Sequence, residues 1–537
     1  MSSVREKVLD QYSARLYKNR KEHLIEIGGK EDDAVTANTR AIPGIITQRG
    51  CCFAGCKGVV LGPIKDAVII VHGPIGCGFY TWGTRRHKAQ ADERDGVATD
   101  SYLEYCFSTD MQETDIVFGG EKKLKQAITE VMDILKPAAI FICSTCPVGL
   151  IGDDIHAVAK WAEKEYDVKC IGFSCEGYKG VSQSAGHHIA NNQLLRYVIG
   201  TGDSTPKQKY SVNILGEYNI GGDGWEVERL LKRCGIEVVS VFTGGSSYSD
   251  ITNAHLANLN LVQCHRSINY IAEMMYDKYG IDWIKVNFIG TKSCSSSLRA
   301  IGEYFNDEEL KSRIEEVIAD ELMNISEEMQ YLKSKLKGKT AALYVGGSRA
   351  HHYQKLLSDF GISTVLAGYE FAHRDDYEGR AVIPDIKPDA DSKNIECITV
   401  EPDPKYYKVY LSEEQKEALK EKGVQLNDYT GMISDMEKGA IVCDDMNHFE
   451  TEELLQVLKP DIFFSGIKDK FVAQKSGRLS RQLHSYDYSG PYAGFRGAVT
   501  FGKDVLMGLS TPAWSYIRAP WKRIPSLNAT LGGENVC

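Results

Sequence analysis

Residues 50–86 have the sequence GCCFAGCKGVVLGPIKDAVIIVHGPIGCGFYTWGTRR, in which an apolar run, Ala67-Val-Ile-Ile-Val71, separates two cysteine-bearing loops. The run is short and β-branched, as expected for a buried strand. Glycines flank Cys51 and Cys77, and a pair of arginines follows the second loop. Glycine lets the backbone approach a bulky group, and thiolates bind soft metals. We therefore interpret this segment as one wall of an iron–sulfur site whose missing ligands come from elsewhere.

The size and charge of the chain narrow the class of protein. Its 537 residues and 59.7 kDa are too many for one hydrophobic core, so we expect about three domains. A net charge of −10 and a pI near 5.8 argue against binding nucleic acid. No apolar run is long enough to span a membrane, and the charged N-terminus lacks the apolar core of a signal peptide, so we expect a cytoplasmic protein. In that reducing compartment the 15 cysteines are not expected to form disulfides.

From residue 49 onward, short β-branched runs alternate with loops and with segments of helical period. This alternation is typical of parallel βαβ units. It predicts an α/β fold of three Rossmann-like domains with parallel sheets flanked by helices. The predicted strands are 67–71, 138–143, 169–173, 210–215, 237–242, 259–262, 341–345, 363–367, 440–443 and 461–464, and the strongest helix spans 310–336. The predicted parts are an N-terminal arm (1–48), a first domain (49–207), a second domain (208–338), and a third domain (339–537) with a surface insertion at about 378–432 and a C-terminal tail.

Five side chains with metal- or anion-binding chemistry follow directly after predicted strands: Cys77, Cys146, Cys264, Arg349 and Lys468. Ligands bind at the carboxyl edge of open parallel sheets. Because these residues come from all three predicted domains, we expect a cofactor site between the domains.

Most of the other cysteines are expected to be small buried apolar residues. They are Cys106, Cys143, Cys170, Cys175, Cys234, Cys294, Cys397 and Cys443. The spacing of Cys51 and Cys56 only loosely matches part of a ferredoxin pattern, and Cys143 and Cys146 form an isolated C-x-x-C. No Walker sequence and no strand-linked G-x-G-x-x-G occurs, so we do not expect this chain to bind ATP or a nicotinamide cofactor.

Long segments resemble the α chains of nitrogenase molybdenum–iron proteins, over about residues 38–377 and 433–515. The most specific are Arg-Gly-Cys51, His-Gly-Pro-Ile-Gly-Cys77, Cys146-Pro-Val-Gly-Leu-Ile-Gly-Asp-Asp, Gly-Val-Ser-Gln183-Ser-Ala-Gly-His187-His, Asn-Leu-Val-Gln-Cys264, Gly-Gly-Ser-Arg349 and Leu-His484-Ser-Tyr-Asp-Tyr-Ser-Gly-Pro-Tyr. The insertion resembles that of a clostridial-type subgroup. His265 departs from the pattern, which often has tyrosine there, and Cys52 and Cys56 add thiols beside Cys51.

The resemblance implies a metal ligand set. Cys51, Cys77 and Cys146 would bind the P-cluster (8Fe-7S), completed by a homologous β chain. Cys264 and His484 would bind the terminal iron and the molybdenum of the iron–molybdenum cofactor (7Fe-Mo-9S-C), which carries homocitrate. Thiolate suits iron, and imidazole suits the harder terminal metal.

Further residues match positions around that cofactor. Arg85 and Arg349, with Gly346 and Gly347 beside the latter, would contact its sulfides, and Gln183 and Lys468 would lie near homocitrate. His187 would hydrogen-bond a bridging sulfide and supply protons, and Val59 would limit access to the reactive face.

The resemblance implies the catalytic α subunit of molybdenum nitrogenase, an α2β2 heterotetramer that reduces dinitrogen to ammonia and protons to hydrogen. An ATP-hydrolysing iron protein would deliver the electrons, and residues 107–120 resemble the segment near its docking surface. The alternatives are a vanadium or iron-only nitrogenase and a non-catalytic scaffold for cofactor assembly. The Cys264/His484 pair favours an enzyme over a scaffold.

Overall fold

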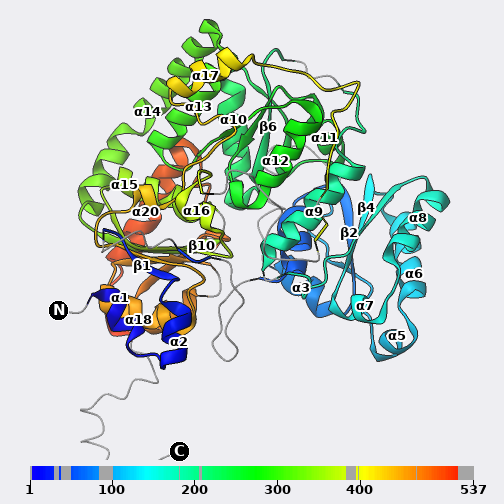
Figure 1. Cartoon of the computed structure of the whole chain (residues 1–537), viewed down its shortest axis with the longest axis horizontal. Coiled ribbons are helices and arrows are strands. Elements are labelled where there is room, and N and C mark those ends of the chain that lie inside the picture. The colour runs from blue at the N-terminus through cyan, green and yellow to red at the C-terminus, as the bar shows by residue number, and fades with distance from the viewer. Residues whose placement is uncertain are drawn as a thin grey trace, which may run out of the picture.

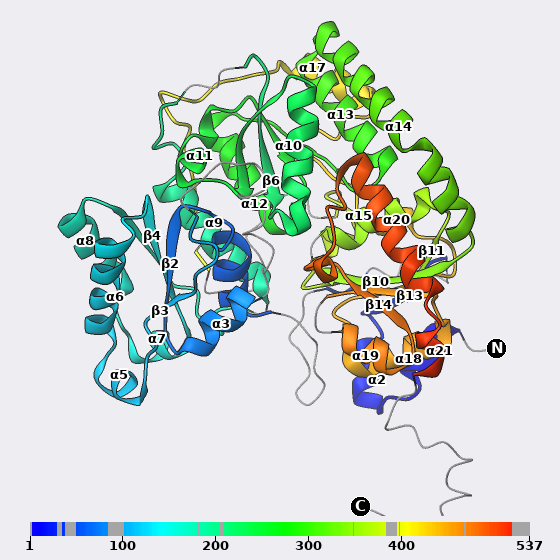
Figure 2. The same ribbon diagram turned by 180° about the vertical axis from the view of Figure 1, so that it is seen from behind.

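The computed structural model describes residues 3–28, 35–37, 50–83, 101–180, 182–204, 208–346, 348–382, 395–396, 398–466 and 469–517. They form three sheets, each in its own lobe (Figures 1 and 2). All strand pairs are parallel except one at an edge, so the predicted α/β fold with parallel sheets is confirmed. Among the described residues no helix is long and apolar enough to cross a membrane.

The first sheet has the order β3-β2-β4-β5 and is buried on both faces. Alternate residues of β4 point into two different cores: Ile140 and Ile142 pack with the α6 and α8 side, and Phe141 and Cys143 with the η1 and α9 side. This is the pattern of a parallel sheet covered on both faces. The elements are η1 (Ala54–Leu61), β2 (Ala67–His72), α3 (Ile75–Gly83), β3 (Phe107–Ser108), α5 (Glu113–Phe118), α6 (Glu121–Ile134), β4 (Ala139–Ser144), α7 (Cys146–Ile151), α8 (Ile155–Tyr166), β5 (Lys169–Phe173) and α9 (Gln183–Tyr197).

The second sheet has the order β7-β6-β8-β9, with α10 and α12 packed against it. The long helix α14 leaves this lobe and lies against α20 of the third. The elements are β6 (Ser211–Glu217), η2 (Ile220–Gly222), α10 (Asp223–Arg233), β7 (Glu237–Thr243), α11 (Tyr248–Thr252), η3 (Ala254–Leu256), β8 (Leu259–Val262), α12 (His265–Tyr279), β9 (Trp283–Lys285), α13 (Thr291–Phe305) and α14 (Glu308–Leu336).

The third sheet has the order β1-β12-β11-β10-β13-β14. In Figure 1 the helices α1, α2 and α18 lie below it, and α15 and α20 lie above it. The elements are α1 (Val4–Leu9), α2 (Ala14–Arg20), β1 (Leu24–Glu26), β10 (Thr340–Gly346), α15 (Arg349–Asp359), β11 (Ser363–Glu370), α16 (Arg374–Glu378), η4 (Ile433–Asp435), β12 (Ile441–Cys443), α18 (His448–Leu458), β13 (Ile462–Ser465), α19 (Lys470–Lys475), β14 (Leu479–Gln482), η5 (Tyr486–Tyr488), α20 (Gly494–Ser510) and α21 (Ala513–Tyr516). Helix α17 (Glu413–Glu421) lies against the second lobe, where Lys416 Nζ donates to the Tyr276 hydroxyl of α12 at 3.2 Å.

The N-terminal segment is more than the predicted arm. Its strand β1 pairs antiparallel with β12, with Leu24 opposite Cys443. The buried Arg20 guanidinium also donates to Glu450 at 2.7 Å. The segment is therefore the edge of the third sheet, a role hidden in its sequence because the strand has only three residues.

Two further predictions need correction. Cys106 is exposed, because it precedes the two-residue edge strand β3 instead of lying inside a covered strand. The insertion does not lie only on the surface: Leu426, Tyr429 and Met432 are buried. Among the other cysteines predicted to be packed, Cys143, Cys170, Cys175, Cys234, Cys294 and Cys443 are buried, and Cys397 falls outside the described residues.

Apolar clusters join the lobes. One core combines Phe53 and Leu194 of the first lobe with Val262 and Met275 of the second. Another combines strand and helix residues of the second sheet with those of the third. The carboxyl ends of the three sheets are therefore held in a fixed relation to one another.

Candidate metal centres

Three cysteines converge at the carboxyl edge of the first sheet. Strands β2 and β4 are paired, with His72 opposite Ser144, so the loops that come after them leave the sheet side by side. Cys77 lies in the first turn of α3, and Cys146 is the first residue of α7. Thr145 ties the two loops together, because its amide and its hydroxyl both donate to the His72 carbonyl oxygen, at 3.2 and 2.9 Å.

Cys51, just before η1, completes the group. A methyl group at Gly177 would lie 3.1 Å from Sγ of Cys146 and 3.2 Å from Sγ of Cys51, so both thiols border the same glycine. Cys77 lies near both of these cysteines. Burial raises the pKa of its thiol, and the charges of Cys146 and Cys51 raise it further. The structure thus brings together the three cysteines that the sequence singled out, on a face where two of them are exposed.

Large apolar side chains surround this face. Ile75, Phe79 and Tyr80 project from α3, and Tyr80 is 74% exposed. Leu150 on α7 is 77% exposed, and Tyr178 is half-exposed beside Gly177. Large apolar side chains left exposed on the elements that carry the cysteines are typical of a face covered by another protein.

A buried network connects this edge to the segment 107–120. His72 lies between Thr109 Oγ1 and Asp153 Oδ2, at 3.0 Å from each, and burial lowers the pKa of its imidazole. Asp153 also accepts from the Gly120 amide at 2.9 Å. The short helix α5 is held by a capping box and presents Phe118 to solvent with 86% of its surface exposed.

Cys264 lies at the carboxyl end of β8, as the N-cap of α12. Its loop lies against the end of β6, where the backbone amide of Gln263 donates to the Leu215 carbonyl oxygen at 2.8 Å. Gly216, with φ +80°, lies so close to Cys264 that a Cβ there would overlap it. The ammonium group of Lys285 is also close. Burial lowers the pKa of Lys285 to about 8, while the charge of Cys264 acts in the opposite direction.

The residue after Cys264 is held on three sides. His265 has Nε2 2.7 Å from Asp376 Oδ1 and Nδ1 2.9 Å from Ser348 Oγ. Its ring stacks on Tyr429 of the insertion, with centroids 4.2 Å apart. Burial, and then the charge of Lys285, lowers the pKa of His265 to about 3, so it is neutral at pH 7. The insertion therefore supports the loop that carries Cys264.

Arg349 begins α15, at the carboxyl end of β10. Its Nη1 donates to the Tyr486 hydroxyl at 2.6 Å, and that hydroxyl donates to Asp223. Glu217 adds a second buried carboxyl group. Burial raises the pKa of both Glu217 and Asp223, and the Arg349 charge opposes this rise. The guanidinium group is thus already oriented by the 484–492 loop and by β6.

His484 follows β14 in the same lobe. A methyl group at Gly466 would lie 2.8 Å from Cε1 of His484 and would also overlap the buried Glu370 carboxylate, so the imidazole and the carboxylate flank one glycine. His187 on α9 is buried, and its ring packs edge-on against Phe371 at 6.2 Å. Phe371 also touches Gly346, so the helix from the first lobe meets the third sheet at this point.

Helix α9 also positions Gln183, whose amide lies against Gly50 in the Cys51 loop. Val59 is half-buried in η1 and packs against the core shared by the first two lobes. Arg85, Lys468 and Gly347 lie outside the described residues.

Sequence reasoning missed Lys285, Glu370, Tyr486 and Asp223. Glu370 is the last residue of β11, and Tyr486 lies in the loop after β14. Their positions at strand ends could have marked them as candidate site residues. Lys285 also ends a strand, β9, and lies opposite Val262 of β8, but that strand has only three residues and was not predicted. For Asp223 the local sequence carries no signal, because its proximity to Arg349 and Tyr486 depends on how the second and third lobes meet.

Comparison with known proteins accords with this geometry. Residues 51–510 match the family model for nitrogenase component 1 type oxidoreductases. The chain is 56% identical to the nitrogenase molybdenum-iron protein alpha chain of Clostridium pasteurianum over 534 residues, 99% of each chain. It is 53% identical to that of Methanosarcina barkeri over 516 residues, 96% of this chain and 95% of the relative. Among solved structures, nitrogenase Cp1 at pH 6.5 matches with a TM-score of 0.92 and 57% identity, over 97% of this chain and 100% of the other. The chain therefore belongs to the nitrogenase component 1 type oxidoreductase family.

Proposed function

We propose that this chain is the catalytic α subunit of a molybdenum nitrogenase, which reduces dinitrogen to ammonia and protons to hydrogen in the cytoplasm. The observation that carries the proposal is the convergence of Cys51, Cys77 and Cys146 on a half-open face ringed by exposed apolar side chains. A homologous β chain covers this face in an α2β2 heterotetramer, and an ATP-hydrolysing iron protein supplies the electrons.

The three cysteines fit the P-cluster. Thiolates are the donors that iron–sulfur clusters require. Gly177 leaves the side between Cys51 and Cys146 free of a Cβ, so a large inorganic group can come close to the backbone there. Three thiolates on one open face supply half of the coordination of an eight-iron cluster, and the β chain supplies the remainder.

Cys264 and His484 fit the two ends of the iron–molybdenum cofactor, because they lie at the carboxyl ends of strands in two different sheets. When bound, this cofactor supplies the metal centre at which dinitrogen is reduced. The nearby cations Lys285 and Arg349 balance the charge of thiolate and sulfide ligands. Arg85, Gly346 and Gly347 would contact the sulfides of the cofactor, as the resemblance implies.

The other residues act on protons, homocitrate and access. His187 would hold and donate a proton at an imidazole nitrogen toward the bound cofactor. Gln183 and Lys468 would bind the carboxylates of homocitrate, as the resemblance implies. Val59 limits which molecules reach the reactive face.

Metal analysis and a pair of cysteine variants test this function. The purified complex should contain molybdenum and abundant iron and should form ammonia with iron protein and ATP. Cys264→Ala should abolish both molybdenum binding and ammonia formation but keep the P-cluster signal in electron paramagnetic resonance. Cys234→Ala, which removes a buried thiol of the same lobe outside the site, should retain all three.

Other results would assign a different function. Vanadium, or iron without either metal, would identify another class of nitrogenase. A complex that binds cofactor but forms no ammonia with iron protein and ATP would identify an assembly scaffold.

A further inference from the structure

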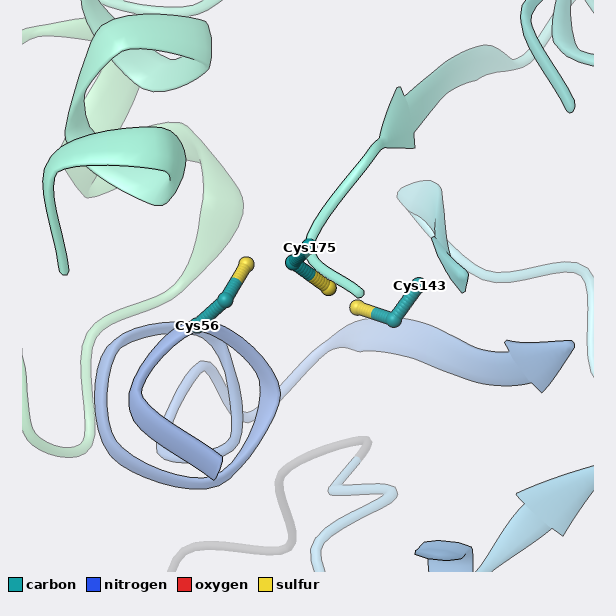
Figure 3. Close-up of side chains that lie close together, drawn as sticks. All are labelled: Cys56, Cys143 and Cys175. Carbon is teal, nitrogen blue, oxygen red and sulfur yellow. The ribbon is translucent and has the colours of Figure 1, made fainter. Parts of the chain in front are cut away.

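A second group of three thiols lies behind the Cys51–Cys77–Cys146 face. It consists of Cys56 on η1, Cys143 on β4 and Cys175, two residues beyond β5 (Figure 3). The three sulfur atoms all lie within 4.8 Å of one another, and none of the three residues is exposed. Figure 3 shows the three side chains side by side on separate backbone segments, with the sulfur atoms of Cys175 and Cys143 facing each other.

The two groups are built back to back from the same segments. The η1 segment supplies Cys51 to the outer group and Cys56 to the inner one, and the end of β4 supplies Cys146 and Cys143. The third segment supplies Cys175 to the inner group, while Gly177 borders the outer thiols. The outer group faces the partner surface, whereas the inner group is sealed between η1 and the first sheet.

The inner group has the size of a mononuclear thiolate site. Three sulfur atoms bound at about 2.3 Å around one ion are about 4 Å apart. Sulfur atoms already within 4.8 Å of one another can close around one ion with small side-chain movements. All three donors are soft, and among the described residues the cluster includes no carboxylate or imidazole. This donor set selects a thiophilic ion over magnesium or calcium.

The surrounding charges also suit a bound cation with deprotonated thiols. Burial raises the pKa of the Cys56 and Cys175 thiols. Burial also acts on Cys143, but hydrogen bonds from the other two thiols and the charge of Lys57 together lower its pKa. Three thiolates and one divalent ion carry a net charge of −1, which the buried Lys57 ammonium balances.

We propose that Cys56, Cys143 and Cys175 form a closed binding site for one thiophilic divalent ion of the zinc type, separate from the ligands of the iron clusters. Binding replaces the thiol protons, which leave to solvent, and involves no change of oxidation state. The ion would cross-link η1, β4 and the segment after β5, and so fix the backbone that also carries Cys51 and Cys146.

Zinc content and zinc X-ray absorption of the intact heterotetramer test the proposal. The complex would be purified without oxygen from cells grown with added zinc, and a second portion would be incubated with zinc chloride and desalted. We expect one zinc ion per chain in at least one of the portions, with three sulfur neighbours at about 2.3 Å. Iron and molybdenum contents should not change, and the readout does not depend on activity.

Two serine variants locate the ion. Cys175→Ser should lower zinc occupancy at least ~10-fold, because a hydroxyl is a poor ligand for this class of ion. Cys170→Ser, which alters a buried thiol in β5 outside the group, should leave it unchanged. If Cys175→Ser does not fold, the absorption spectrum of the unaltered complex decides the question by itself.

Several outcomes would overturn the proposal. They are the absence of stoichiometric zinc from both portions, zinc bound mainly by nitrogen or oxygen, and zinc with iron neighbours, which would place it in the outer cluster. A disulfide between two of the three cysteines in the intact complex would instead identify a redox pair.

Discussion

Substitution of Gly177 by alanine tests whether the space between Cys51 and Cys146 belongs to a metal cluster. The new methyl carbon would lie 3.1 Å from Sγ of Cys146 and 3.2 Å from Sγ of Cys51. Comfortable contacts of this kind are about 3.7 Å, so each sulfur must retreat by about half an ångström. Overpacking of this size costs about 1–3 kcal/mol when side chains can move, and bound cluster ligands cannot move freely.

We expect Gly177→Ala to lose the P-cluster while keeping the rest of the protein. The iron content of the purified complex should fall and the P-cluster signal should disappear, whereas molybdenum should be retained. Gly58→Ala is the matched control: Gly58 is another glycine of this lobe and is buried, but its methyl group would meet Thr81 at an ordinary 3.6 Å. A Gly177→Ala complex with full iron content and an unchanged signal would refute the geometry described for this face.

Three further substitutions test other parts of the structure. Asp376→Asn should lower the free energy of unfolding by about 3 kcal/mol, since it removes a buried carboxylate charge that interacts with both Arg266 and His265. Glu378→Gln, which breaks a more exposed pair with Arg374, should cost less than about 1 kcal/mol. Equal shifts in the urea midpoint for the two variants would contradict this reasoning. Burial, and then the Arg20 charge, lowers the pKa of His23 from 6.5 to about 4. Between these two pH values His23 is protonated in the unfolded chain but neutral in the folded one, so the free energy of unfolding falls as the pH drops from about 6.5 toward 4. His23→Gln should remove up to about 3 kcal/mol of that fall, measured as the difference between urea midpoints at two pH values, and an unchanged pH dependence would show that His23 does not contribute. Phe118→Ala should weaken association with the iron protein by roughly 2 kcal/mol, which is a rise of about 30-fold in the half-saturating concentration of iron protein, with unchanged metal content. Met323→Ala, which also removes an exposed apolar side chain but on α14, should not change this concentration. A similar rise in both variants would argue against docking at α5.

The sequence predicted the α/β class, most strand positions and the strand ends that carry Cys77, Cys146, Cys264 and Arg349. These predictions succeed because a strand buried on both faces is a continuous apolar run, and the loop after such a strand must lie at the carboxyl edge of the sheet. The resemblance to a known family then assigned the roles of individual residues. Those roles stay predictions for every site residue, and Arg85, Gly347 and Lys468 also lie outside the described residues.

The misses have physical causes. Cys106 has the local sequence of a strand residue, but burial depends on a neighbouring strand that the edge of a sheet lacks. Tyr429 belongs to a polar, Pro-rich insertion whose apolar residues become important only because they pack on α12 and His265. The inner group of Cys56, Cys143 and Cys175 comes from three separate segments, and no spacing rule connects them.

The pairing of β1 with β12 has a consequence for how the chain is made. Arg20 and its partner Glu450 are 430 residues apart in the sequence. At about 5–20 residues per second, a ribosome needs about 20–90 s to add that length of chain. During that time the first strand to be synthesised has no neighbour, and its unpaired backbone can join the edge of another sheet. The third lobe can close only near the end of translation, so the last part of the fold to form contains the first residues to emerge. A chaperone that shields residues 20–28 during this time should therefore raise the yield of assembled protein.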